Sequence, residues 1–303
     1  MSTGRRGQTG NPARNRGGLA ARAARRAGGG AVQAVLILVA LFWLVPSFGL
    51  LIASLRSEQD NSAGGWWRAL TAPSQLTGQA YAALLERPDF LDSFWNTVLI
   101  TVPATALVVV IAAPAAYAFA WLDFPGRDRL FLLVVTLLVV PVQVALIPVA
   151  ELYGRIGIGG LHLFGSVAGV VLFHVAFGLP FAIFLLRNFF AAIPRDLLEA
   201  ARLDGGSDRT ILRRVVLPLG APAIASLAVF QFLWVWNDLL VALVFADTGA
   251  QPMTKWLQSQ TRQFSGNIDV LAPGAFLSLL VPLAVFFAFQ RHFVRGVMAG
   301  SLK

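Results

Sequence analysis

Cysteine is absent from this chain of 303 residues, and charged side chains are scarce. The absence of cysteine excludes structural disulfides, cysteine-ligated metal sites and a cysteine nucleophile. Aspartate, glutamate, lysine and arginine make up 13 % of the residues, whereas a soluble domain contains about 25 %. Because 57 % of the residues are hydrophobic, we expect an integral membrane protein.

Motifs for catalysis and nucleotide binding are also missing. The sequence contains no phosphate-binding loop of the form G-x4-G-K-[ST] and no H-E-x-x-H motif, so it predicts no Walker-type ATP site and no enzyme activity. The three histidines are isolated in the sequence, which predicts no metal site and no cofactor on this chain.

Six apolar runs are each close to the roughly 20 residues that cross the hydrocarbon core of a bilayer. The pattern predicts an all-α membrane protein with six transmembrane helices in one domain, residues 31–303. Prolines inside the runs indicate kinked helices that line a cavity, because each proline leaves a backbone carbonyl unpaired. The six spans cover about residues 31–55, 97–121, 130–150, 163–186, 221–246 and 271–290.

Residues 1–30 contain seven arginines and no apolar periodicity, which predicts a disordered, basic cytoplasmic tail. No aromatic residues are interleaved with these arginines, so nucleic-acid binding is not expected. A cytoplasmic N-terminus places 18 of the 24 lysines and arginines on the cytoplasmic side and 6 on the other. The positive-inside rule therefore predicts that both termini are cytoplasmic.

The longest polar interval in the last two thirds of the chain is the stretch 193–222. Pro194 suits the first turn of a helix, and Gly205 with Gly206 can end that helix. Ser207 can then cap a second short helix. A helix–glycine–helix loop on the basic side of a membrane protein is typical of a docking element.

The order of residues in this stretch resembles the EAA loop, EAA–x2–DG–x11–LP–x3–P, of permease subunits of binding-protein-dependent ABC importers. Asn96-Thr97 and Tyr117-Ala118 also fit this family, and over residues 31–303 the chain looks like the MalG-type carbohydrate permeases. Two departures, Gly206 for the usual Ala and Leu212 for the common Phe, are expected to weaken the docking helix slightly. The matching residues are Glu199, Ala200, Ala201, Asp204, Gly205, Leu217, Pro218 and Pro222.

The resemblance implies the type I importer permease fold, with a cytoplasmic coupling loop in which residues 199–205 contact an ATPase. It implies a heterodimer with a second permease subunit, above an ATPase dimer that binds ATP and Mg²⁺. It also implies an extracytoplasmic solute-binding protein, contacted by the outer loop 247–270, although a solvated connection is the alternative for this loop. The implied function is import of a sugar, a di- or oligosaccharide, across the bacterial plasma (inner) membrane, with lipid around the spans.

The fifth span holds most of the polar groups at membrane depth. At about 100° per residue, five side chains share a stripe about 120° wide, and Trp236 points away from it. Aromatic faces can stack on the C–H face of a sugar, and amides and a carboxylate can bond its hydroxyls. The stripe is therefore a candidate substrate path, although Asn237 and Asp238 could instead hold neighbouring helices together. It consists of Phe230, Gln231, Trp234, Asn237 and Asp238.

Other functions stay open at this point. An ion-coupled secondary transporter would use Asp238 and His174 as proton sites, but it has no use for an ATPase-docking loop. A membrane scaffold would not need the polar stripe. An ABC permease for glycerol-3-phosphate esters would need cationic residues in the path, and none lies at membrane depth, which favours a neutral sugar.

Overall fold

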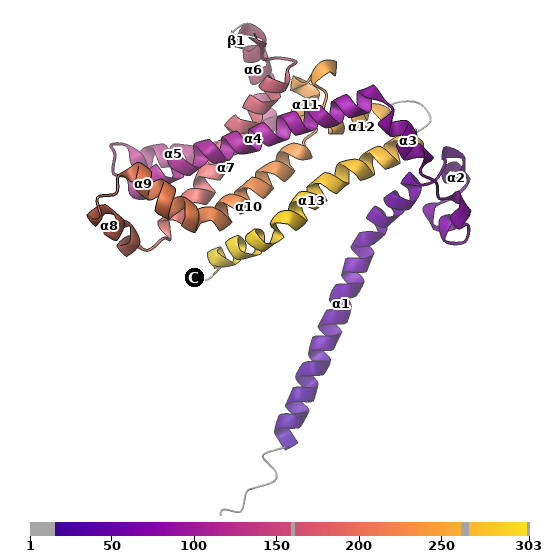
Figure 1. Cartoon of the computed structure of the whole chain (residues 1–303), viewed down its shortest axis with the longest axis horizontal. Coiled ribbons are helices and arrows are strands. Elements are labelled where there is room, and N and C mark those ends of the chain that lie inside the picture. The colour runs from indigo at the N-terminus through magenta and orange to yellow at the C-terminus, as the bar shows by residue number, and fades with distance from the viewer. Residues whose placement is uncertain (1–15, 159–160, 262–266, 302–303) are drawn as a thin grey trace, which may run out of the picture.

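The computed structural model describes residues 16–158, 161–261 and 267–301, and it is almost wholly helical (Figure 1). Within these residues, five unbroken helices are long and apolar enough to cross a membrane, and there are six such spans if a bent pair of helices counts as one. The predicted all-α membrane fold is therefore confirmed. The five helices are α1 (Arg16–Ser54), α4 (Pro88–Trp121), α7 (Val167–Ala191), α10 (Leu217–Trp236) and α13 (Ile268–Ser301).

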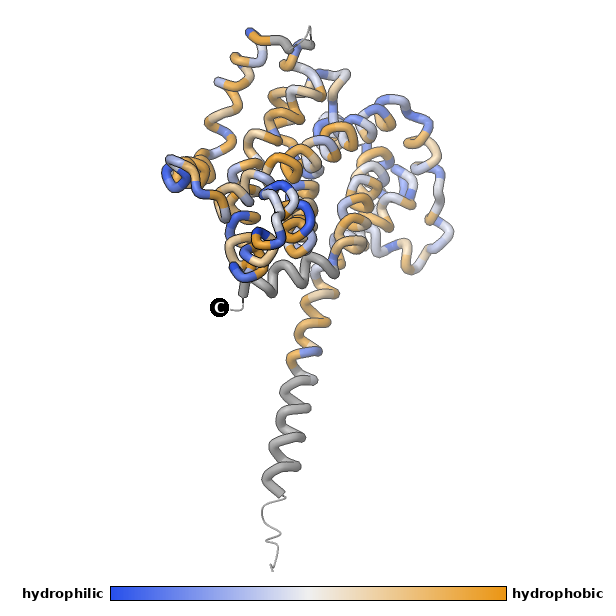
Figure 2. The backbone as a smooth tube through the Cα atoms, turned by 60° about the vertical axis from the view of Figure 1, so that its left-hand side comes forward, coloured by the Kyte–Doolittle hydropathy of each residue, from blue (hydrophilic) through white to orange (hydrophobic). Residues whose placement is uncertain are grey.

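The helix α1 starts earlier than the sequence predicts and contacts the body through α13 and η2. It begins at Arg16, so the predicted disordered tail 1–30 is helical in its second half, because alanine and arginine are good helix formers. Residues 1–15 lie outside the described part of the chain. Figures 1 and 2 show that α1 joins the body at the C-terminal end of the helix and extends away from it. Residues 32–48 of α1 are exposed.

The centre of the body is the packing of α4 along α7, with α10 against both and α13 against α10. On α4, the fully buried residues Ala104, Val108, Ala112 and Ala116 recur every four positions and so lie on one face. Small side chains at such positions let two helix backbones approach closely. This close contact holds the elements that carry the candidate site.

The third predicted span, 130–150, is not one straight helix. It consists of α5 (Arg127–Leu137) and α6 (Val142–Arg155), bent by 100° at the break between them. Pro141 starts α6 with extended backbone angles, because proline lacks the N–H that would continue α5 and disfavours helix at the preceding residue. Beyond α6, β1 (Gly157–Ile158) and β2 (Leu161–His162) form a short antiparallel hairpin.

The fifth predicted span, 221–246, is also interrupted. The helix α10 ends at Trp236, and a second short helix, α11 (Leu240–Phe245), follows after the three residues Asn237, Asp238 and Leu239. The prediction of a continuous helix was wrong here because asparagine and aspartate compete for backbone hydrogen bonds and favour helix ends. The opposite orientation of Trp236 is confirmed: it is buried, and its Nε1 donates to the Ser278 carbonyl on α13 at 3.1 Å.

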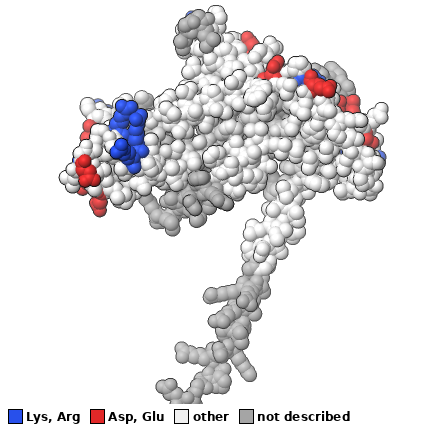
Figure 3. Space-filling model, viewed as in Figure 1, with Lys and Arg blue, Asp and Glu red and all other residues white. Residues whose placement is uncertain are grey.

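Short elements close both ends of the body. One end carries α8 (Arg195–Leu203), α9 (Asp208–Ile211) and the π-helical turn η4 (Leu212–Val216). On the face seen in Figure 3, charged residues gather at the two ends and the middle is uncharged, as expected for a body that spans a membrane. The other end carries α2 (Glu58–Ala63), η2 (Trp66–Leu70), η3 (Pro73–Gln75), α3 (Gln79–Leu85), η5 (Thr248–Ala250) and α12 (Met253–Thr261).

Candidate functional site

The helix α8 ends in the glycine cap that the sequence predicts. Gly205 has a φ of +81°, its N–H donates to the Arg202 carbonyl at 3.0 Å, and the N–H of Gly206 donates to the Ala201 carbonyl at 3.0 Å. These two bonds form a Schellman motif. The predicted cap on the second helix is also present, since the Ser207 hydroxyl accepts from the Thr210 N–H.

Gly206 has a structural role that the sequence comparison did not suggest. A Cβ at this position would lie 2.6 Å from the Ala201 carbonyl oxygen, closer than a carbon can approach without a backbone shift. The glycine therefore fits the cap of α8. The expectation that this departure from Ala weakens the helix was wrong.

The residues of the EAA pattern point away from the body, while one neighbour anchors the helix. Glu199, Ala200 and Asp204 are exposed and Ala201 is half-buried. Leu198 is only 1 % exposed and belongs to the main hydrophobic core. The helix α8 thus packs through its apolar face and presents the acidic and small side chains of the motif to the outside, where another protein can bind them.

Polar contacts connect this loop to the ends of two spanning helices. The Asp208 carboxylate accepts a hydrogen bond from the Tyr117 hydroxyl at 3.0 Å, and its Oδ1 lies 3.8 Å from Nη2 of Arg202. Arg202 also donates to the carbonyl of Trp121, the last residue of α4, at 3.4 Å. Trp121 Nε1 in turn donates to the carbonyl of Phe190 on α7 at 2.9 Å. A displacement of α8 and α9 would therefore be passed to α4 and α7.

The same loop runs into α10 through a π-helical turn. In η4 the backbone is wider than in an α-helix, and the N–H of Leu217 donates to the carbonyl of Leu212, five residues earlier. Such turns often occur at functional sites. With no break between η4 and α10, the motion of the loop also reaches the helix that carries the predicted substrate path.

Three of the five predicted path residues lie together on a cavity. Phe230, Gln231 and Trp234 of α10 face a volume of about 250 Å³. The sequence did not predict the opposite wall, which α7 supplies with Phe177, Gly178 and Phe181. Prolines inside the spans, such as Pro180 of α7, had indicated kinked helices that line a cavity, but not which side chains face it.

Asn237 and Asp238 do not line this cavity, so the predicted single stripe of five residues is wrong. Asn237 caps α10 and its Nδ2 donates to the Leu233 carbonyl at 2.8 Å. One Asp238 carboxylate oxygen accepts from the N–H groups of Val241 at 3.0 Å and Ala242 at 3.2 Å. That oxygen also lies 3.7 Å from Nε2 of the buried His174. The regular 100° step failed because the helix ends before these residues.

Hydrogen bonds between distant parts of the chain, called the latch here, hold the end of the body opposite α8 and α9. Nδ2 of Asn96 donates to the carbonyls of Gly249 and Gln251 at 3.1 Å and 3.2 Å. The Thr97 hydroxyl accepts from the Met253 N–H at 2.7 Å. Asn96-Thr97 had been noted only as a family resemblance, and its role could not be inferred without knowing which loop lies opposite.

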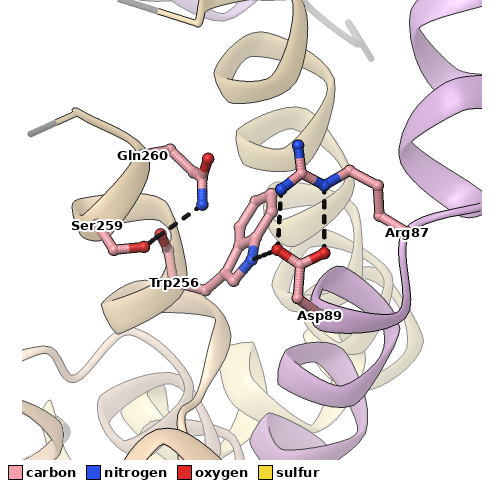
Figure 4. Close-up of polar contacts among 5 residues, drawn as sticks. All are labelled: Arg87, Asp89, Trp256, Ser259 and Gln260. Atoms are coloured by element: carbon pink, nitrogen blue, oxygen red, sulfur yellow. Dashed lines mark hydrogen bonds and ion pairs between the residues drawn. The ribbon is translucent and has the colours of Figure 1, made fainter. Parts of the chain in front are cut away.

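The helix α12 packs against the first turn of α4 (Figure 4). Trp256 is buried, and its Nε1 donates to Asp89 Oδ2 at 2.9 Å. Asp89 also pairs with Arg87 at 2.9 Å, and this hydrogen bond raises the pKa of Arg87 above its already high usual value. Gln260 is buried as well. Residues 250–260 of the loop 247–270 are therefore packed against the body, whereas residues 247–249 are exposed. Residues 262–266 lie outside the described part of the chain.

The comparisons with known proteins agree with this architecture. Residues 80–299 match the family described as the binding-protein-dependent transport system inner membrane component. The chain is 47 % identical over 277 residues to the osmoprotective compounds uptake permease protein GgtD of Synechocystis sp., covering 90 % of this chain and 91 % of that protein. It is 47 % identical over 239 residues to the alpha-glucoside transport system permease protein AglG of Rhizobium meliloti, covering 77 % of this chain and 62 % of that protein.

A solved structure shares the fold. It is the crystal structure of a bacterial ABC transporter involved in the import of the acidic polysaccharide alginate, with a TM-score of 0.74 at 22 % sequence identity, covering 89 % of this chain and 98 % of the other. The resemblance deduced from the EAA pattern is thus confirmed. The chain belongs to the family of inner membrane components of binding-protein-dependent transport systems.

Proposed function

We propose that this chain is the transmembrane permease subunit of an ABC importer that moves a sugar, a di- or oligosaccharide, into the cytoplasm. The observation that carries the proposal is the coupling loop, in which α8 presents Glu199, Ala200 and Asp204. The loop is bonded to α4, and α4 is bonded in turn to α7. An exposed docking helix fixed to the ends of spanning helices suits the transfer of motion from an ATPase. Relatives named as alpha-glucoside and trehalose permeases support a sugar as the solute.

The coupling follows from the contacts of the loop. When two ATPase subunits close on ATP, the α8 helices that they hold are drawn together. Because the loop is joined to α4 through Tyr117 and Arg202 and runs directly into α10, the spanning helices move with it. Access to the pore then changes from the cytoplasmic to the outer side, a solute-binding protein releases sugar, and hydrolysis restores the first state.

The proposed assembly contains four further components. They are a second, different permease subunit, two copies of an ATPase that bind ATP and Mg²⁺, and a solute-binding protein on the outer side. The importer lies in the bacterial plasma (inner) membrane, with both termini of this chain in the cytoplasm, as the excess of 18 over 6 basic residues supports. The outer end with α12 is then the surface nearest to the binding protein.

Reconstitution tests the proposal. The chain is assembled in proteoliposomes with its second permease, ATPase and binding protein, and uptake of labelled trehalose, maltose and sucrose is measured with enclosed ATP. We expect ATP-dependent uptake of a neutral sugar that persists when a protonophore collapses the proton gradient. Uptake that requires the gradient would favour the ion-coupled carrier, and uptake of glycerol 3-phosphate in place of sugars would favour the phosphate-ester permease.

A further inference from the structure

The cavity between α7 and α10 has a chemistry that is more specific than a general path for polar solutes. Its volume is about 250 Å³, and each helix contributes three of the residues around it. Four of these residues are aromatic and none is charged. The six residues are Phe177, Gly178, Phe181, Phe230, Gln231 and Trp234.

The side-chain amide of Gln231 lies on the wall of this cavity, and its hydrogen bonds are incomplete. The residue is 4 % exposed, and its Nε2 has no hydrogen-bond partner among the described residues. Leaving a buried donor unpaired is unfavourable, and such groups in natural proteins call for an explanation. A ligand that offers an acceptor oxygen would provide the missing bond.

Gly178 makes the room in which this amide can turn. A Cβ at position 178 would lie 2.7 Å from Nε2 and 2.8 Å from Oε1 of Gln231. The terminal torsion of a glutamine side chain has a broad energy minimum. Without a Cβ opposite it, the amide can therefore rotate from the backbone of Gly178 toward the cavity while α7 and α10 stay in place.

Trp234, on the same wall, is held in a defined orientation. Its ring meets the ring of His174 edge to face, with 5.2 Å between the centroids and an angle of 89°. His174 lies 3.7 Å from the carboxylate of Asp238, which the backbone of α11 fixes. His174 and Asp238 are thus positioning residues, and they stabilise an aromatic surface on which a ligand can stack.

We propose that this cavity binds one ring of a neutral sugar, with the C–H faces of the ring against Trp234 and the phenylalanines and a hydroxyl oxygen accepting from Nε2 of Gln231. This inference rests on the proposed function and specifies its substrate class. The volume is below the range of about 300–1,000 Å³ for drug-sized sites, so an oligosaccharide passes one ring at a time. A phosphate or carboxylate on the solute would be buried here without a cation, at a high cost.

Cysteine protection in the reconstituted importer tests the binding step, because this chain has no cysteine of its own. Phe181→Cys reports on the cavity. Leu172→Cys on the same helix is the matched control, because Leu172 does not line the cavity. The two native residues are similarly exposed, at 41 % for Phe181 and 37 % for Leu172. The partner subunits are made free of cysteine. Labelling by a membrane-permeant maleimide is followed during turnover, with and without whichever of trehalose, maltose or sucrose the importer takes up.

We expect the transported sugar to slow labelling of Phe181→Cys severalfold and to leave Leu172→Cys unchanged. Gln231→Leu should raise the KM for uptake about tenfold, the loss expected for one buried hydrogen bond. Gly178→Ala should raise the KM in the same direction, because its Cβ occupies the space in which the amide lies and turns.

Several results would overturn the inference. They are equal protection of the two cysteines, an unchanged KM in both Gln231→Leu and Gly178→Ala, or ATP-driven uptake of glycerol 3-phosphate in preference to the three sugars. If Gln231→Leu does not assemble, Gly178→Ala and the cysteine pair still decide. The two hypotheses fail in different ways. If the proposed function is wrong, no ATP-dependent uptake of sugar is observed. If only this inference is wrong, sugar is taken up but does not slow the labelling of Phe181→Cys.

Discussion

The coupling loop, residues 194–218, and the outer segment, residues 246–261, are both bonded to distant helices, but the contacts that shape them differ. The loop is shaped by bonds between near neighbours, such as the N–H of Gly206 to the carbonyl of Ala201. The outer segment is held by residues far away in the chain, such as Thr97, which is 156 positions from its partner Met253. Most side chains of α8 are exposed, whereas Met253 and Trp256 of α12 are buried.

This difference indicates what each region does. A segment that docks on another subunit must form its own shape and keep its polar side chains free, and local caps achieve both. A segment that closes one end of a helical body must bring distant helices together, and buried long-range bonds achieve that. Substitutions in the loop should therefore disturb coupling more than stability, and substitutions in the outer segment should do the reverse.

The largest effect is expected at Gly205. Its φ of +81° is unfavourable for a β-branched residue, although open space surrounds the position. Gly205→Val should leave the protein inserted and abolish stimulation of the ATPase and uptake in proteoliposomes. Gly78→Val is the control, because Gly78 also faces open space but has a φ of −94°. Undiminished stimulation in an intact Gly205→Val complex would contradict the role of the loop.

A change at Thr97 should act on stability. Thr97→Val removes the acceptor of the Met253 N–H, and an unpaired buried group costs about 1–3 kcal/mol. Thermal unfolding in detergent should show a lower midpoint, while the assembled variant keeps ATPase coupling. Thr136→Val is the matched control, since the exposed Thr136 bonds only within its own helix, to Leu132. Equal midpoints for the two variants would show that the latch does not hold the outer end.

A smaller effect is expected at Asp238. Asp238→Asn keeps an acceptor oxygen for the N–H groups of Val241 and Ala242, so uptake should fall by only about fivefold, the difference between a charged and a neutral hydrogen bond. Asp238→Leu, which removes the acceptor, should lose far more. Both are measured as ATP-driven uptake with and without a protonophore. Complete loss in Asp238→Asn, with uptake dependent on the proton gradient, would mean that the carboxylate carries protons.

The two ends can finally be assigned to the two sides of the membrane with changes that hardly affect function. Ser207→Cys in the coupling loop should be labelled only from the cytoplasmic side, and Ser74→Cys at the exposed outer turn only from outside. Right-side-out and inside-out vesicles with an impermeant maleimide give the measurement, and the chain without cysteine is the blank. Reversed labelling would refute the orientation derived from the basic residues.

Patterns among residues close together in the sequence predicted much of the structure. The apolar runs located the spanning helices, the glycines and Ser207 defined the turn between α8 and α9, and the periodicity of α10 correctly separated Phe230 and Trp234 from Trp236. These features depend on residues within one or two turns of each other, so the sequence contains their physical cause. The EAA spacing was informative for the same reason, because it describes a single continuous segment.

By itself, then, the sequence determined the all-α membrane class, the coupling loop and half of the cavity wall. Only the tertiary structure decided that α7 supplies the other half through Gly178, that Asn96 and Thr97 hold the outer segment, and that the chain breaks at Asn237. The reason is physical. A hydrogen bond or a cavity between helices depends on which surfaces meet after packing. From the sequence alone, Asp238 could either continue α10 or cap α11. Its surroundings in the folded chain, including His174, make the cap on α11 the more stable arrangement.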